Sequence, residues 1–304
     1  MTTRDGPLAA ARTAAAARLP ARPLRRSELW RAWRRFVRYR PGIAGLVVVV
    51  VIGLVAIFAN ALAPYSPLAI NSGMRGAGPT PAHPLGFDQI GRDILSRLIY
   101  GSRVAIVIAV LATGIAVAIG VAVGTTAGYL GGRVDAVLSR ITDALMAFPV
   151  LVLLIALVAV VGPSLTNVIL VIGATVWASY ARVVRADVLS LREQEFVMAA
   201  RAIGARDRRI IWRHLVPNVV SPVIVLATLS VGNIIILEAA LSFLGLGVRP
   251  PTPDWGGMLA DGRGYITIYP QIVIAPGVMI ALTVLAFNLL GDGLRDALDP
   301  RHRE

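Results

Sequence analysis

The chain contains no cysteine and no lysine, although it has 304 residues and 30 basic side chains, all of them arginine. Without cysteine, it has no disulfide, no thiolate nucleophile and no cysteine-ligated zinc or iron–sulfur site. Without lysine, it cannot form a conventional P-loop, because the lysine of that loop reaches the nucleotide phosphates. The three histidines, His83, His214 and His302, are too scattered in sequence to indicate a metal cluster. We therefore expect no metal site, no cofactor and no catalytic residue on this chain.

Charge is scarce as well. Only 15% of the residues are charged, against about a quarter in soluble proteins, while 56% are hydrophobic and the mean hydropathy is +0.72. The charges are bunched between long uncharged runs, as in membrane proteins, because a charge at the bilayer centre is costly. The net charge of +13 would suit nucleic acid. However, the arginines flank apolar runs instead of covering one face of a domain, so we expect no nucleic-acid partner.

Five uncharged stretches predict an all-α membrane protein with six transmembrane helices. A helix needs about 20 apolar residues to cross a hydrocarbon core of ~30 Å. The stretch 144–181 is too long for one crossing, and Gly162, Pro163 and Ser164 favour a turn within it. The predicted helices cover residues 43–63, 104–126, 143–162, 165–183, 215–236 and 270–290.

The distribution of arginine predicts the orientation of these helices. Of the 30 arginines, 24 fall on the side of the N-terminus, and six fall in the segments 64–103 and 237–269 on the other side. Because arginine-rich loops stay in the cytoplasm, we expect both termini inside the cell.

The remaining segments complete the predicted organisation. Residues 1–25 are rich in Ala, Arg and Pro and are expected to be a disordered basic tail; the next apolar run is too long for a signal peptide. Residues 26–64 combine a juxtamembrane helix, whose tryptophans and arginines suit lipid headgroups, with the first transmembrane helix. Residues 65–103 form an extracytoplasmic loop. Residues 104–304 form a five-helix core with a cytoplasmic loop at 190–217 and a short cytoplasmic C-terminus.

The cytoplasmic loop between helices 4 and 5 has a helix–turn–helix pattern. Glu195 opens a short helix, where an acidic residue suits the helix dipole, and Gly204 ends it in a left-handed turn. A second short piece, 210–215, leads to Pro217 at the start of the next helix. The first helix has apolar residues at three- and four-residue spacing: Phe196, Ala199, Ala200 and Ile203. A loop lying on lipid would show the same periodicity, so the pattern alone leaves both interpretations open.

The residue identities resemble the EAA loop of binding-protein-dependent ABC importer permeases. The matching residues are Glu195, Ala199, Ala200, Gly204, Ile211 and Pro217. Three further stretches resemble the DppC/OppC branch, which handles dipeptides, oligopeptides and nickel: His83–Arg103, Glu238–Gly256 and Asn288–Arg301. Here the acidic residue precedes the alanine pair instead of adjoining it, a spacing that is usual in this branch.

The resemblance implies a transport subunit of a bacterial inner membrane, not an enzyme. The loop would be a coupling helix seated on a cytoplasmic ATPase, with ATP and magnesium bound by two partner ATP-binding subunits. A homologous second permease and an extracytoplasmic solute-binding protein would complete the importer. Peptides are the first expectation for the solute, with nickel complexes, opines and oligosaccharides open. A secondary transporter is the alternative, although no inverted repeat is evident; a membrane enzyme lacks a recognisable catalytic constellation.

Several extracytoplasmic residues are further candidates for contact with the binding protein or the solute pathway. Asp88, Arg92 and Asp93 precede helix 2; with Arg97 they have the i,i+4 spacing of ion pairs on a surface helix. Glu238 lies at the outer end of helix 5, where an acidic residue is either functional or packed.

Other polar residues have two interpretations each. Asp254 and Trp255 belong to a docking or re-entrant element, or to an ordinary turn. Asn233 and Asn288 line the pathway or bond between helices. A short cytoplasmic helix bracing the ATPase contact is predicted from four charged residues near the C-terminus: Asp292, Arg295, Asp296 and Asp299.

Overall fold

The structure, a computed structural model, describes residues 26–298. The predicted tail at 1–25 and Asp299 lie outside the described residues. All the secondary-structure elements of the described residues are helices, which confirms the predicted all-α class. The helices are α2 Arg26–Arg38, α3 Arg40–Ile57, α4 Ala59–Leu62, α5 Ile94–Leu130, α6 Gly132–Met146, α7 Val150–Val161, α8 Leu165–Leu191, α9 Glu195–Ala202, α10 Asp207–Ile210, α11 Val216–Phe243, α12 Trp255–Gly262 and α13 Gln271–Leu298.

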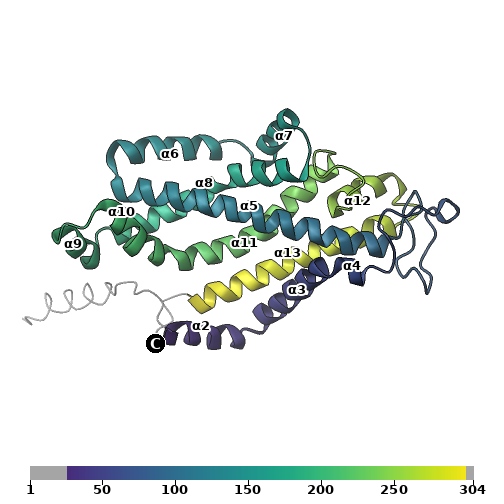
Figure 1. Ribbon diagram of the computed structural model, residues 1–304, viewed down its shortest axis with the longest axis horizontal. Coiled ribbons are helices and arrows are strands. Elements are labelled where there is room, and N and C mark those ends of the chain that lie inside the picture. The colour runs from purple at the N-terminus through teal and green to yellow at the C-terminus, as the bar shows by residue number, and fades with distance from the viewer. Residues whose placement is uncertain (1–25, 299–304) are drawn as a thin grey trace, which may run out of the picture.

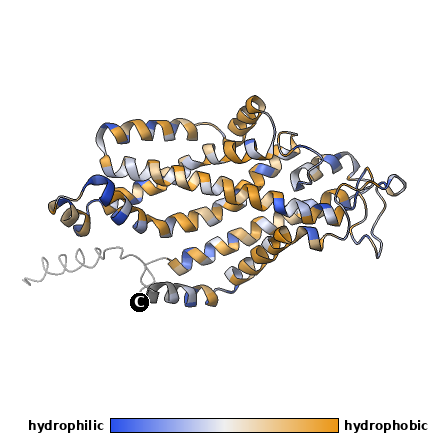
Figure 2. Ribbon diagram, viewed as in Figure 1, coloured by the Kyte–Doolittle hydropathy of each residue, from blue (hydrophilic) through white to orange (hydrophobic). Residues whose placement is uncertain are grey.

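Five segments are long and apolar enough to cross a membrane, and the bent α6–α7 pair makes a sixth when its two helices are taken together as one broken span. The five are α3, α5, α8, the continuous run Asp207–Phe243 and α13. They lie side by side along the long axis of the molecule, with α9 and α10 at one end and α12 toward the other (Figure 1). Most of their residues are hydrophobic (Figure 2), as membrane-spanning helices require.

The centre of the bundle is the pairing of α5 with α8. Small residues of α5 allow the two backbones to approach closely, as is common between helices in membranes. Glycine has no Cβ atom. If Gly124 carried one, it would lie 2.5 Å from the carbonyl oxygen of Ala181, and a Cβ on Gly128 would lie 2.9 Å from the carbonyl oxygen of Arg185. The start of α8 agrees with the sequence prediction, because Ser164 caps it by accepting a 3.1 Å hydrogen bond from the Asn167 amide.

The predicted third helix, 143–162, is wrong as a single straight span. The chain forms α6 over Gly132–Met146, breaks at residues 147–149, and resumes as α7 at an angle of 90°. Pro149 explains the break: it has no amide hydrogen to donate, and its ring disfavours the helical conformation of Phe148 before it.

Three other boundaries differ from the prediction. α5 begins at Ile94, ten residues earlier than expected, because Asp93 caps it by accepting a 2.7 Å hydrogen bond from the Ser96 amide. The second piece of the cytoplasmic loop is not separate, since α10 continues through a π-turn, Ile211–Leu215, into α11. The predicted C-terminal helix is also not separate: α13 continues through Asp292, Arg295 and Asp296 to Leu298.

The predicted juxtamembrane helix is present as α2. Its Phe36 is buried and anchors α2 where α3 and α13 meet. The Phe36 ring lies close to Gly293 of α13, because a Cβ on that glycine would be 2.9 Å from the ring. Trp30 and Trp33 are exposed. Contact of these tryptophans with lipid headgroups stays a prediction.

Candidate functional site

The cytoplasmic loop projects from one end of the bundle as an ordered helix and turn (Figure 1). α9 begins at Glu195, as predicted, and ends in a Schellman motif: the Gly204 amide donates to Arg201 O at 2.9 Å and the Ala205 amide to Ala200 O at 3.0 Å. Gly204 has φ +78°, the left-handed conformation that the sequence predicted. The turn therefore reverses the chain sharply between α9 and α10.

One face of the loop is fixed to the bundle. Val197 and Ala200 of α9 are buried in a hydrophobic cluster with residues from three long helices. Pro217 lies within the first turn of α11, and Ile211 is partly buried against the same cluster. The other members are Tyr129, Val184, Val188, Ile210, Leu215, Val219 and Val223.

The opposite face of the loop exposes large apolar side chains. Met198 is 50% exposed, Ile203 86% and Trp212 60%, and Ala199 is exposed as well. The sequence predicted one apolar face containing Phe196, Ala199, Ala200 and Ile203. That prediction is wrong in part, because the structure divides these residues between the two faces.

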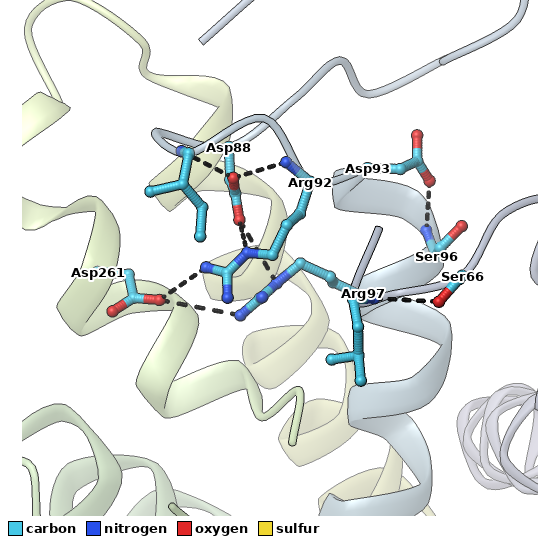
Figure 3. Close-up of polar contacts among 9 residues, drawn as sticks. Ser66, Asp88, Arg92, Asp93, Ser96, Arg97 and Asp261 are labelled. Carbon is cyan, nitrogen blue, oxygen red and sulfur yellow. Dashed lines mark hydrogen bonds and ion pairs between the residues drawn. The ribbon is translucent and has the colours of Figure 1, made fainter. Parts of the chain in front are cut away.

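The other end of the bundle holds a charge cluster in which Asp88, Arg92 and Arg97 are buried and Asp261 is exposed (Figure 3). Asp88 accepts hydrogen bonds from the amides of Ile90 and Arg92 and one of 2.5 Å from Arg92 Nε. Asp261, on α12, pairs with Arg92 at 3.2 Å and with Arg97 at 3.8 Å. The cluster thus connects the extracytoplasmic segment before α5 to α12.

This arrangement corrects the predicted surface helix. Asp88 lies in a loop and Arg92 pairs with it there, but Arg97 pairs with Asp88 and Asp261, not with Asp93. Asp93 caps α5 and also lies 2.8 Å from His83 Nδ1. Asp88, Arg92 and Asp93 are all buried, so their contacts are internal to the chain.

Asp254 and Trp255 start α12 and are also buried. The Asp254 carboxylate caps the helix by accepting a 2.8 Å hydrogen bond from the Gly257 amide. The Trp255 indole donates a 3.0 Å hydrogen bond to Leu98 O, and a Cβ on Gly101 would lie 2.6 Å from its ring. Asp254 and Trp255 thus begin a short helix that packs against α5, so they do not form an ordinary turn.

The remaining candidates differ in exposure. Glu238 is 2% exposed and accepts a 2.8 Å hydrogen bond from the Ser242 hydroxyl. Asn233 and Asn288 are both exposed, and Asn288 faces α11, because a Cβ on Gly232 would lie 3.4 Å from its Oδ1. Among residues 26–298, no group of three or more His, Asp or Glu side chains is placed to hold a metal ion.

The sequence of the loop and core matches a known family. The profile described as "Binding-protein-dependent transport system inner membrane component" matches residues 118–304. This chain belongs to that family of ABC importer permeases. The profile "N-terminal TM domain of oligopeptide transport permease C" matches residues 27–79, which includes α2 and α3. The permease is therefore an inner-membrane transport subunit and not an enzyme, and the secondary-transporter and membrane-enzyme alternatives are set aside.

Relatives of known name are similar in sequence to almost the whole permease. It is 44% identical over 273 residues, 90% of each chain, to the dipeptide transport system permease protein DppC of Alkalihalophilus pseudofirmus. It is 44% identical over 270 residues, 88% of this chain and 89% of the other, to the glutathione transport system permease protein GsiD of Escherichia coli. A chain of the MetNI methionine ABC transporter, in an inward-facing conformation, has the same fold at 19% identity and a TM-score of 0.54, covering 67% of this chain and 96% of that one.

Proposed function

We propose that this permease imports peptides, and that α9 transmits the movement of a cytoplasmic ATP-binding subunit to the transmembrane bundle. The named relatives at 44% identity transport dipeptides and glutathione, which is itself a small peptide. This supports peptides over nickel complexes, opines or oligosaccharides.

The observation that carries the coupling role is the two-sided build of the α9–α10 loop. One face is buried in the bundle, and the other presents Met198, Ile203 and Trp212 to the cytoplasm. Large apolar groups exposed together on an ordered loop suit contact with another protein or with a membrane. Hydrophilic residues surround them at this end of the molecule (Figure 2), so insertion of the whole loop into lipid is less favourable.

The buried face gives the loop a mechanical connection to the long helices. Val197 and Ala200 pack in one cluster with residues of α5, α8 and α11. A push on α9 therefore moves three spans together, because close-packed interiors transmit strain. In the complete importer we expect two ATP-binding subunits, which hold ATP and magnesium, and a second, homologous permease.

At the other end we propose that an extracytoplasmic binding protein docks and releases the solute. Asp88, Arg92, Asp93, Asp254 and Trp255 are buried, so we assign them an indirect role. They hold the segment before α5 and α12 in one rigid arrangement. Their carboxylates and guanidinium groups would support the docking surface from beneath.

Reconstitution of the importer in lipid vesicles tests this proposal. The permease, its second permease, the ATP-binding subunits and the binding protein are combined, and ATP-driven uptake is measured for labelled dialanine, glutathione and maltotriose. We expect uptake of at least one of the two peptides and none of the oligosaccharide. Uptake of maltotriose alone, or uptake that does not require ATP, would overturn the proposal.

A further inference from the structure

The elbow between α6 and α7 is a break in a membrane span that the rest of the chain leaves uncovered. Residues 147–150 are all exposed, and the Phe148 side chain is 61% exposed. The two helices meet at 90°. α7 begins at Val150 after Pro149 without a side-chain cap.

The elbow lies near the middle of the bundle along its axis. α6 starts beside the cytoplasmic end of α8, where a Cβ on Gly131 would lie 3.2 Å from Arg192. Gly162 follows the end of α7, and a Cβ on it would lie 3.8 Å from Arg249 of the extracytoplasmic loop. Between these ends, Leu145 packs against a cluster around Trp177 in the middle of α8. The break therefore falls at mid-membrane depth.

Backbone groups at this depth must find polar partners. In the elbow the Ala147 amide donates to Asp143 O and the Leu153 amide to Pro149 O. The first amides of α7 and the last carbonyls of α6 have no partner within their own helices, as at any helix end. Irregular backbone is tolerated inside a membrane only where protein covers it or water reaches it. Lipid is therefore excluded as the neighbour of this elbow.

A second observation indicates water as the neighbour. Asp143 and Arg182, just below the elbow, form a 2.8 Å ion pair and are 58% and 54% exposed. Both side chains stay more than half exposed although they pair with each other, and exposed charges need water around them because hydrocarbon cannot solvate them. Beside them α5, α6 and α8 border an open hollow of about 220 Å³, in which Ser139, Thr142 and Arg185 line the wall together with apolar residues such as Val123 and Leu138.

We propose that the α6–α7 elbow and this hollow line the water-filled solute pathway of the permease. The inference rests on the transport function of the complex, but it needs neither the identity of the solute nor the contact of α9 with the ATPase. The exposed backbone amides and carbonyls of the elbow would offer hydrogen bonds to the peptide groups of a passing solute.

Cysteine labelling tests the proposal, because the chain has no cysteine of its own. Phe148→Cys is compared with Val50→Cys on the unbroken span α3, where Val50 is 49% exposed, and with Ile70→Cys, 61% exposed, in the extracytoplasmic segment. Each complete importer is placed in lipid nanodiscs without nucleotide and treated with a charged, lipid-insoluble thiol reagent. Total thiol is measured after denaturation, and Met146→Cys, also exposed, serves if Phe148→Cys does not assemble.

We expect Phe148→Cys to react at least about tenfold faster than Val50→Cys, because only the thiolate reacts and it forms only in contact with water. A rate close to that of Ile70→Cys would support the pathway assignment further. A rate as slow as that of Val50→Cys would overturn it, whether lipid or the second permease covers the elbow. The assay uses no ATP, so failure of the coupling proposal would leave this result unchanged.

Discussion

The Tyr129 hydroxyl donates a 2.8 Å hydrogen bond to the Asp207 carboxylate, joining the end of α5 to the start of α10 across 78 residues of chain. The guanidinium of Arg201, on α9, lies over the same ring at 4.8 Å from its centroid. One aromatic side chain therefore contacts both halves of the cytoplasmic loop. This places Tyr129 at the junction through which movement of the loop would reach the bundle.

Replacing Tyr129 with Phe tests this junction. The change removes the hydrogen bond to Asp207 and the longer one, 3.4 Å, that Arg201 Nε donates to the same hydroxyl, but it keeps the ring under the guanidinium of Arg201. A lost hydrogen bond is worth about 1 kcal/mol, so we expect peptide uptake per ATP hydrolysed to fall about two- to fivefold. Tyr265→Phe, at the opposite end of the molecule, is the control and should leave the ratio unchanged. An unaltered ratio in Tyr129→Phe would show that the hydrogen bonds of this hydroxyl do not contribute to coupling.

The left-handed turn at Gly204 gives a second prediction. A Cβ on Gly204 would meet no atom within 4 Å, and φ is +78°. A side chain there would therefore cause no clash, and it would destabilise the turn only through the strained backbone conformation. A β-branched residue is strongly disfavoured in this conformation, whereas Asn tolerates it. We expect Gly204→Val to lower ATP-driven uptake at least tenfold, with Gly204→Asn retaining most of it. Equal uptake by the two variants, at equal membrane levels, would contradict a role for the turn.

The extracytoplasmic charge cluster predicts unequal effects of its two aspartates on stability. Asp88→Ala leaves the buried guanidinium of Arg92 without its close partner. For a buried pair, this loss lowers the free energy of unfolding by about 3–5 kcal/mol. Asp261 is 46% exposed, so Asp261→Ala should cost about 1 kcal/mol or less. Thermal unfolding of the two variants in detergent micelles measures the difference. Similar midpoints for both would show that the cluster is not a buried support.

Two glycines of α5 form a matched pair for testing the packing against α8. A Cβ on Gly124 would lie 2.5 Å from Ala181 O, whereas one on Gly114 meets nothing within 4 Å. We expect Gly124→Ala to destabilise the permease by about 1–3 kcal/mol through overpacking. Gly114→Ala should be neutral or stabilising by up to about 1 kcal/mol, since Ala favours the helix more than Gly does. The same thermal assay decides, and equal effects at both positions would refute the close α5–α8 contact.

Most of the fold could be predicted from the sequence because hydropathy and local capping residues determine it. Ser164 marks the start of α8, and Gly204 marks the end of α9, as the structure confirms. The break in the third span was missed because residues 143–162 are nearly all apolar, and hydropathy does not register a bend. Pro149 was the available signal, and it should have outweighed the uninterrupted apolar run.

The candidate sites were predictable only where the residues are neighbours in sequence. The i,i+4 spacing identified the Asp88–Arg92 pair, but it assigned Arg97 to the wrong carboxylate. Its partner Asp261 lies on α12, 164 residues further along the chain, and no local pattern links the two. Likewise, nothing near Tyr129 in the sequence indicates Asp207. Such contacts follow from helix packing, which the hydrophobic pattern constrains only in outline.

Cross-linking from the tip of the cytoplasmic loop tests the central claim most directly. Ile203 is 86% exposed beside Gly204, and a cysteine introduced there is the only thiol on this chain. It is labelled with a photoactivatable cross-linker in the complete importer, and the products are identified by mass spectrometry. The account predicts an adduct between residue 203 and an ATP-binding subunit. A fully labelled permease that cross-links only to lipid, or to no ATP-binding subunit, would contradict it.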